Sequence, residues 1–217
     1  MLRKSTQFKF LKDDIHYCMR IGAERYHKDK AKGIREQRYV SQKKKSAMDL
    51  DVFGVVGEYA MTRLLNQSTQ MLNDTTPQGI RQDRGDLIID GVKIDTKCSV
   101  GNHVDMWVRE NSLRNPSHVY ALLTYERVNP LKMPAEYQDD FCSLHENEDL
   151  IITFQGAACA SDVFQSQYKQ IIRGDAKYVY PKEKLLDLQD AIEQYKKLSD
   201  RDKDFLNRHN KKNACFF

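Results

Sequence analysis

The sequence contains no apolar run near the ~20 residues needed to cross a bilayer, so it predicts no transmembrane helix and no membrane partner. It also has no internal repeat and no long linker rich in Gly, Ser or Pro, which favours one domain. Its opening, MLRKSTQFKFLKDD, is basic but lacks a continuous apolar segment, so we predict no signal peptide. The five cysteines include no CxxC pair, which argues against a zinc site and a disulfide framework. We therefore expect reduced thiols and a cytoplasmic location, in the host's cytoplasm if a phage encodes the chain.

Charge is nearly balanced over the whole chain but not along it. The 217 residues carry 35 Lys and Arg against 31 Asp and Glu, a net charge of +4. Residues 20–45, RIGAERYHKDKAKGIREQRYVSQKKK, contain a clear excess of cations, which favours contacts with nucleic-acid phosphates. A solvated helix face followed by a polar loop is the alternative interpretation. The candidate phosphate-binding residues are Lys28, Lys30, Lys32, Arg35, Arg38, Lys43, Lys44 and Lys45.

Hydrophobic periodicity predicts helices and strands in an order typical of an α/β (α+β) protein. Helices are expected at 13–33 and 49–66, and strands at 103–110, 117–128 and 148–158. Trp107, in the first of these strands, is expected in the core. A helical turn at 161–171, a short edge strand at 176–181 and a last helix from about Pro181 follow. We predict a central mixed β-sheet flanked by α-helices.

The second helix contains a carboxylate close to its apolar stripe. Glu58 lies at the edge of this stripe, where an unpaired charge is costly. Gly54 and Gly57 are unfavourable in a helix by about 1 kcal/mol each relative to Ala. We expect them to let the helix approach the sheet closely.

Residues 85–97, GDLIIDGVKIDTK, predict a β-hairpin. Asp90-Gly91 is a strong signal for a two-residue type I′ turn, in which both residues have positive φ. The turn fixes the register, so that Ile89 pairs with Val92 and Asp86 pairs with Asp95. Side chains alternate between the faces of a strand, so one face carries the apolar set and the other carries Asp86, Asp95 and Lys97.

Two opposed carboxylates destabilise the hairpin unless a cation lies between them. A hard divalent ion such as Mg²⁺ accepts one or two carboxylates together with waters and phosphate oxygens. Lys97 lies two residues beyond Asp95 on the same face and is close enough to orient a water. An exposed Asp-Lys-Asp salt-bridge patch is the alternative.

Glu58 on a helix, Asp86 on a strand and Asp95-x-Lys97 on the next strand together resemble the PD-(D/E)xK nuclease superfamily. The resemblance covers roughly residues 49–127, and the later segments are similar to small phage, homing and restriction-type members. Gly85 departs from the motif, which has Pro at this position. The resemblance implies a restriction-endonuclease-like core at 47–198, preceded by a basic helix and arm at 1–46 and followed by a tail at 199–217.

The resemblance also implies residue roles. Asp86, Asp95 and the backbone carbonyl of Thr96 would bind Mg²⁺ or Mn²⁺, Glu58 would hold a metal-bound water, and Lys97 would position the attacking water. The activity would be hydrolysis of phosphodiester bonds, with DNA rather than RNA as the expected substrate and a homodimer as the expected form for double-strand cleavage. Additional contacts to the nucleic-acid backbone are expected from Ser99, Asn102 and His103.

Two other functions remain open at this point. The chain is alternatively a non-catalytic protein on the same fold that binds nucleic acid or a partner, with relict carboxylates. A structural or regulatory protein without nucleic acid would require the hairpin charges to be plain salt bridges. Metal-dependent cleavage of plasmid DNA would distinguish the nuclease hypothesis from these two alternatives.

Overall fold

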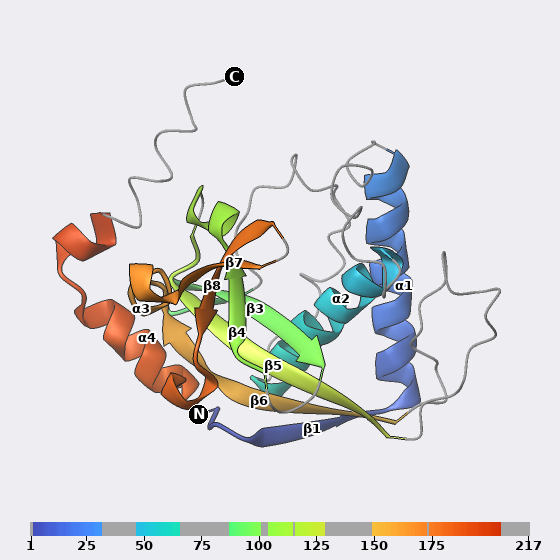
Figure 1. The fold of residues 1–217 in the computed structure, drawn as a ribbon. Helices are drawn as coiled ribbons and strands as arrows, with labels where there is room; N and C mark the ends of the chain where they lie inside the picture. Colours follow the sequence, from blue (N-terminus) through green and yellow to red (C-terminus); the bar gives the residue numbers. More distant parts are fainter. Residues whose placement is uncertain are drawn as a thin grey trace. The chain divides into compact units, whose positions relative to one another are not determined.

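The protein has a mixed α+β fold (Figure 1), which confirms the predicted fold class. The computed structural model describes residues 2–31, 47–65, 87–100, 104–114, 116–128, 149–172 and 174–204. In chain order, with η for a 3₁₀ helix, the elements are β1 (Thr6–Phe10), α1 (Lys12–Ala31), α2 (Ala47–Leu64), β2 (Leu87–Ile89), β3 (Val92–Val100), β4 (Met106–Arg109), η2 (Glu110–Arg114), β5 (Val119–Val128), β6 (Asp149–Cys159), α3 (Ala160–Val163), η4 (Ser166–Tyr168), β7 (Lys169–Ile172), β8 (Asp175–Tyr180), η5 (Lys182–Lys184) and α4 (Leu188–Lys197). No helix among these residues is long and apolar enough to cross a membrane.

The strands form two sheets. The larger has the order β1-β6-β5-β3-β2, and the smaller has the order β4-β8-β7. The backbone N–H of His118, just before β5, donates to the carbonyl of Lys93 near the start of β3 at 2.9 Å. Because β3 and β5 begin side by side they run parallel, whereas β2 and β3 are antiparallel, so the larger sheet is mixed as predicted.

The chain divides into two compact units. Unit 1 comprises Met1–Thr6, Asp83–Leu123 and Phe154–Phe217, and unit 2 comprises Gln7–Gln82 and Thr124–Thr153. Strands β5 and β6 pass from one unit into the other. The predicted basic segment therefore contributes more than an arm, because β1 joins the larger sheet and α1 belongs to unit 2.

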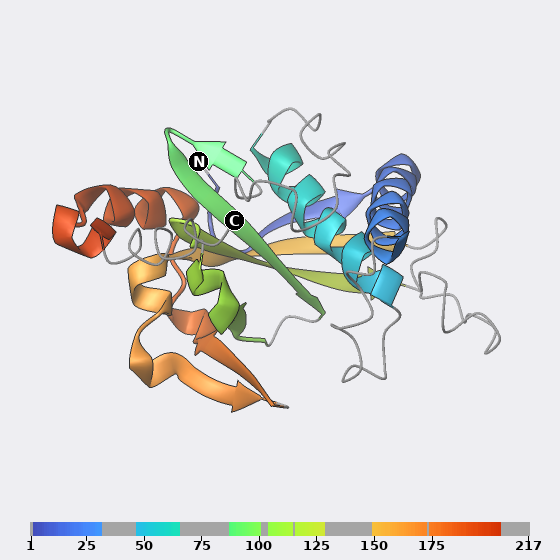
Figure 2. The same ribbon diagram turned by 90° about the horizontal axis from the view of Figure 1, so that it is seen from above.

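In unit 2, α1 and α2 lie side by side (Figures 1 and 2). Helix α1 begins with Asp13 and Asp14 and ends with Lys28 and Lys30, which complement its dipole. The buried Asp14 carboxylate accepts a hydrogen bond from the backbone N–H of Leu11 at 2.8 Å, which caps the helix. Its other oxygen accepts a 2.5 Å hydrogen bond from the hydroxyl of Tyr59, which connects the cap to α2.

The close approach between these helices depends on Gly22 of α1, not on Gly54. A Cβ atom at Gly22 would lie 2.5 Å from the Cα of Val52, whereas a Cβ at Gly54 would meet nothing within 4 Å. The expectation that Gly54 permits close packing was therefore wrong, while Gly57 is buried.

The apolar core of unit 1 lies beneath the smaller sheet. Its members come from β4, β5, β6, α3, β8 and the segment before α4. They are Met106, Val108, Tyr120, Leu122, Ala158, Ala160, Val163, Phe164, Tyr178, Tyr180 and Leu185.

The smaller sheet differs from the prediction in three respects. Strand β7 was not predicted, and β8 is the central strand of the sheet instead of an edge. Trp107 is 50% exposed, so its expected place in the core was wrong. Met106 and Val108 face the core, and the two-residue period of a strand then directs Trp107 outward.

The last helix begins later than predicted, at Leu188 instead of near Pro181. The start of the chain is tied to this point: the backbone N–H of Lys4 donates to Asp187 Oδ1 at 2.7 Å, and that of Leu188 donates to the Leu2 carbonyl at 3.2 Å.

Candidate functional site

The β2–β3 hairpin has the predicted register. Leu87 pairs with Ile94, Ile88 with Lys93, and Ile89 with Val92. Asp90 and Gly91 have φ values of 48° and 77°, as a type I′ turn requires. The turn prediction is confirmed.

The alternation of faces along the hairpin is confirmed as well. Leu87, Val92 and Ile94 are buried, whereas Ile88 is 48% exposed on the opposite face. Asp95 and Lys97 belong to this opposite face, because they lie an odd number of residues beyond Val92 and Ile94, which are buried on the other face.

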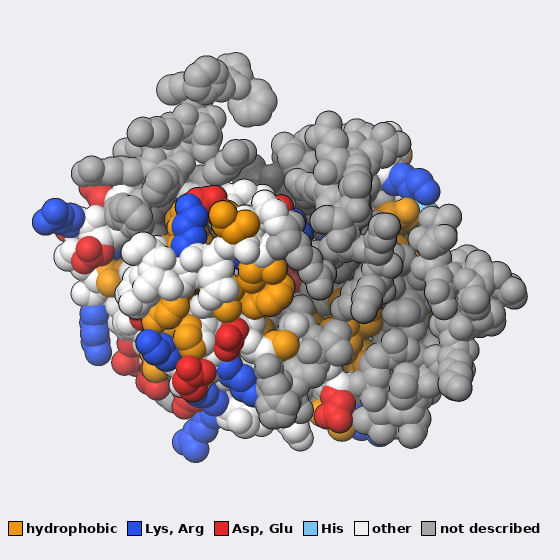
Figure 3. Space-filling model, viewed as in Figure 1, with side chains coloured by type: hydrophobic (Ala, Val, Ile, Leu, Met, Phe, Trp, Pro, Cys, Tyr) orange, Lys and Arg blue, Asp and Glu red, His pale blue; other side chains and the backbone are white. Residues whose placement is uncertain are grey.

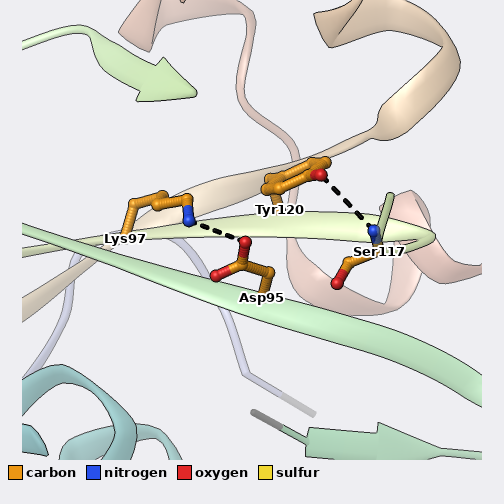
Figure 4. Close-up of polar contacts among 4 residues, drawn as sticks. All are labelled: Asp95, Lys97, Ser117 and Tyr120. Carbon is orange, nitrogen blue, oxygen red and sulfur yellow. Dashed lines mark hydrogen bonds and ion pairs between the residues drawn. The ribbon is translucent and has the colours of Figure 1, made fainter. Parts of the chain in front are cut away.

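Asp95 and Lys97 form an ion pair at the centre of the candidate site (Figure 4). Lys97 Nζ lies 2.6 Å from Asp95 Oδ2, and the two side chains are 29% and 21% exposed respectively. The ammonium also lies 5.7 Å from the centroid of the Tyr120 ring. Tyr120 is fully buried on β5, and its hydroxyl accepts a 3.3 Å hydrogen bond from the backbone N–H of Ser117. The ring thus supports the Lys97 ammonium by a cation–π contact.

Asp95 has an oxygen that is not used by this pair. Within the described part of the chain, Oδ1 accepts no hydrogen bond and its side chain reaches solvent. A carboxylate offers about four lone-pair sites, and one ammonium occupies only part of them. Oδ1 is therefore available to a cation or to water.

Several predicted site residues lie outside the described residues. They are Asp86, Lys32, Arg35, Arg38, Lys43, Lys44, Lys45, Asn102 and His103. Of the remaining predicted contacts, Lys28 and Lys30 are exposed in the last turn of α1, and Ser99 is half-buried on β3. No group of three or more His, Cys, Asp or Glu side chains is placed for metal binding within the described ranges.

Glu58 belongs to unit 2, where it is paired with an arginine that the sequence interpretation missed. Arg25 Nη1 lies 2.9 Å from Glu58 Oε1, with side-chain exposures of only 12% and 13%. Arg25 projects from α1 and Glu58 from α2. The expected need of this carboxylate for a partner is met by Arg25.

We expect Arg25→Met to lower the free energy of unfolding by about 2 kcal/mol, because a nearly buried Glu58 carboxylate then lacks its counter-charge. Glu58→Met should cost a similar amount. The double variant should lose less than the sum of the two single losses. Urea unfolding at neutral pH measures all three, and strictly additive losses would contradict a coupled pair.

His118 is a second residue that the sequence interpretation did not single out. Its Nδ1 accepts a 3.0 Å hydrogen bond from the backbone N–H of Lys93, and its ring stacks on Tyr195 with centroids 4.3 Å apart. Burial, together with the nearby charge of Lys93, lowers the pKa of His118. The neutral imidazole therefore holds the start of β3 against β5.

This lowered pKa predicts acid sensitivity. Because the folded protein binds the His118 proton less readily than the unfolded chain does, stability is complete above the ordinary pKa of about 6.5 and decreases as pH falls below it. In His118→Asn, where an amide oxygen replaces Nδ1 as acceptor, unfolding free energy should depend less on pH between about 7 and 5. The exposed-histidine variant His27→Asn should keep the wild-type slope.

The protein is thus an α+β protein whose β2–β3 hairpin carries the Asp95–Lys97 ion pair on one face. The chain belongs to a family of unknown function (DUF5843), whose model matches residues 4–195. No curated protein and no solved structure matches the sequence significantly.

Proposed function

We propose that the protein is a divalent-metal-dependent DNA endonuclease. The observation that supports the proposal is the hairpin register, which matches the predicted register as far as Leu87 and Ile94. The pairing of Asp86 with Asp95 stays a prediction, because Asp86 lies outside the described residues. A binder of polyanions gains nothing from two opposed aspartates, whereas a metal site uses them.

The residues present fit Mg²⁺ or Mn²⁺. Asp95 Oδ1, on a side chain that is 21% exposed, is a hard oxygen ligand, and Asp86 and the Thr96 carbonyl would complete the protein's share of the donor set. Such an ion lowers the pKa of bound water and polarises a phosphate. The predicted role of Glu58 at the metal stays a prediction: Glu58 belongs to unit 2, where its Oε1 is paired with Arg25.

Lys97 would act on the attacking water. Its ammonium has three N–H donors, and the bond to Asp95 occupies one of them. The ammonium would orient a water or stabilise charge on a phosphate oxygen, and its contacts with Asp95 and the Tyr120 ring restrict the position of Nζ.

The DNA backbone would be held mainly by the basic segment at 20–45. On the face shown in Figure 3, the cations of the described residues are interspersed with carboxylates instead of gathered into one patch. Lys28 and Lys30 at the end of α1 are exposed and supply the described part of this contact. A homodimer acting in the cytoplasm would cut both strands.

A non-catalytic nucleic-acid-binding protein is the second candidate. The observation that favours it is the Asp95–Lys97 pair itself, since two opposite charges 2.6 Å apart also neutralise each other without any metal.

Incubation of supercoiled plasmid with the full chain tests the two candidates. Nicked or linear DNA should appear with Mg²⁺ or Mn²⁺ and disappear when a chelator is added. A protein that retards the plasmid on a gel but never nicks it, with either ion, would support the binding protein and remove the nuclease.

A further inference from the structure

The smaller sheet has one face that the apolar core does not use. We call it the outer face; it carries Trp107 and Arg109 of β4, Asp175, Lys177 and Val179 of β8, and Gln170 and Ile172 of β7. The opposite face supplies Met106, Val108, Tyr178 and Tyr180 to the core. In Figure 2 the β7–β8 hairpin, in orange, projects from the rest of unit 1.

Two cations oppose each other on the outer face. Arg109 of β4 pairs directly with Lys177 of β8, and like charges in such a pair destabilise a sheet. Lys177 is only 7% exposed, so its ammonium is also largely removed from water. Neither side chain forms an ion pair or hydrogen bond anywhere in the part of the chain that the structure describes.

Trp107 lies beside this pair. Lys177 Nζ is 5.1 Å from the Trp107 ring centroid, a cation–π distance that compensates part of the cost of burying the ammonium. Half of the Trp107 surface nevertheless remains exposed, and Arg109 is exposed two residues further along the same strand. An indole surface and two cations thus meet on one sheet face.

We propose that the outer face binds single-stranded nucleic acid, with a base stacked on Trp107 and the neighbouring phosphate held by the exposed Arg109, while the buried Lys177 adds positive charge beneath them. An aromatic platform bordered by cations on a sheet is suited to unpaired bases, because every base offers a flat π surface and every nucleotide one negative charge. A duplex keeps its bases stacked on one another and would not use the indole.

The charges on the outer face also indicate where the phosphates of the bound nucleic acid would lie. Phosphate would relieve the repulsion between Arg109 and Lys177, which no described carboxylate does. Asp175 lies at the turn end of β8, opposite Ile172, and Asp105 is engaged by the backbone N–H of Lys182 at 3.0 Å. Both would keep a phosphate chain near Arg109. The proposal for this face rests on the proposed function in one respect only, namely that the ligand is a nucleic acid.

Trp107 is the only tryptophan, so its fluorescence reports on the site directly. A short oligothymidylate should quench it in the presence of EDTA, where no metal-dependent cleavage occurs. Anisotropy of the labelled oligonucleotide should show an affinity about tenfold lower for Trp107→Ala. Arg109→Gln should weaken binding and reduce the salt dependence by about one counterion.

Two control variants separate this site from the proposed nuclease site. Arg201→Gln removes an exposed arginine outside the sheet and should bind like the wild type. Asp95→Asn should also keep its affinity. Unchanged Trp107 fluorescence at saturating oligonucleotide, or wild-type affinity in both Trp107→Ala and Arg109→Gln, would overturn the proposal even if plasmid is cleaved. Loss of binding in those variants would uphold it even if plasmid is never cleaved.

Discussion

Asp95→Asn should reduce metal-dependent nicking of plasmid DNA by at least about a hundredfold, because loss of groups that merely support metal ligands already costs 10–100-fold. The amide keeps the shape of the carboxylate and one acceptor oxygen but lacks its charge. It also removes the charge attraction from the 2.6 Å contact with Lys97. The rate is best measured from the decay of supercoiled plasmid at saturating Mn²⁺.

Asp190→Asn is the matched control for this variant. Asp190 is an exposed carboxylate on α4 of the same unit, so its substitution changes net charge equally and should leave the rate unaltered. Lys97→Met should lose activity as Asp95→Asn does, whereas Lys93→Met, which alters a lysine of the same strand and face, should retain it. Equal rates in Asp95→Asn and wild type would eliminate Asp95 as a metal ligand.

The part of the candidate site that could be predicted from the sequence lies in the β2–β3 hairpin. Asp90-Gly91 determines the turn, and the turn determines which residues oppose one another, so the Asp95–Lys97 arrangement follows from about a dozen adjacent residues. Arg25 and His118 could not be found in this way. Arg25 meets Glu58, and His118 meets Lys93, across sequence separations of 33 and 25 residues, and only tertiary packing brings such residues together.

The smaller sheet shows why strand order is harder to predict than strands. We expected an edge strand at 176–181, but β8 is the central strand of its sheet, and Pro181 follows its last residue and so removes no hydrogen bond from the ladder. Strand β7 is short, and its Ile171 is 79% exposed, so it lacks a buried alternation. The residues of β4 that face the core could have been predicted from the sequence, because a core position for Met106 and Val108 requires Trp107 to face outward.

Gly22→Ala should destabilise unit 2 by up to about 2 kcal/mol. The added Cβ would lie 2.5 Å from Val52 Cα and 2.8 Å from its backbone nitrogen, so α1 and α2 must move apart. Overpacking of this kind costs up to about 3 kcal/mol, of which the better helix propensity of Ala returns about 1 kcal/mol. The midpoint of urea unfolding should fall accordingly.

Gly54→Ala makes the same chemical change in the neighbouring helix and should have the opposite sign. Gly54 is exposed, and its Cβ would meet nothing within 4 Å, so only the propensity gain of about 1 kcal/mol remains. The two variants should therefore differ by up to about 3 kcal/mol in unfolding free energy. Since propensity is common to both, that difference isolates the contact between Gly22 and Val52. Equal stability of the two variants would mean that α1 and α2 do not approach at this point.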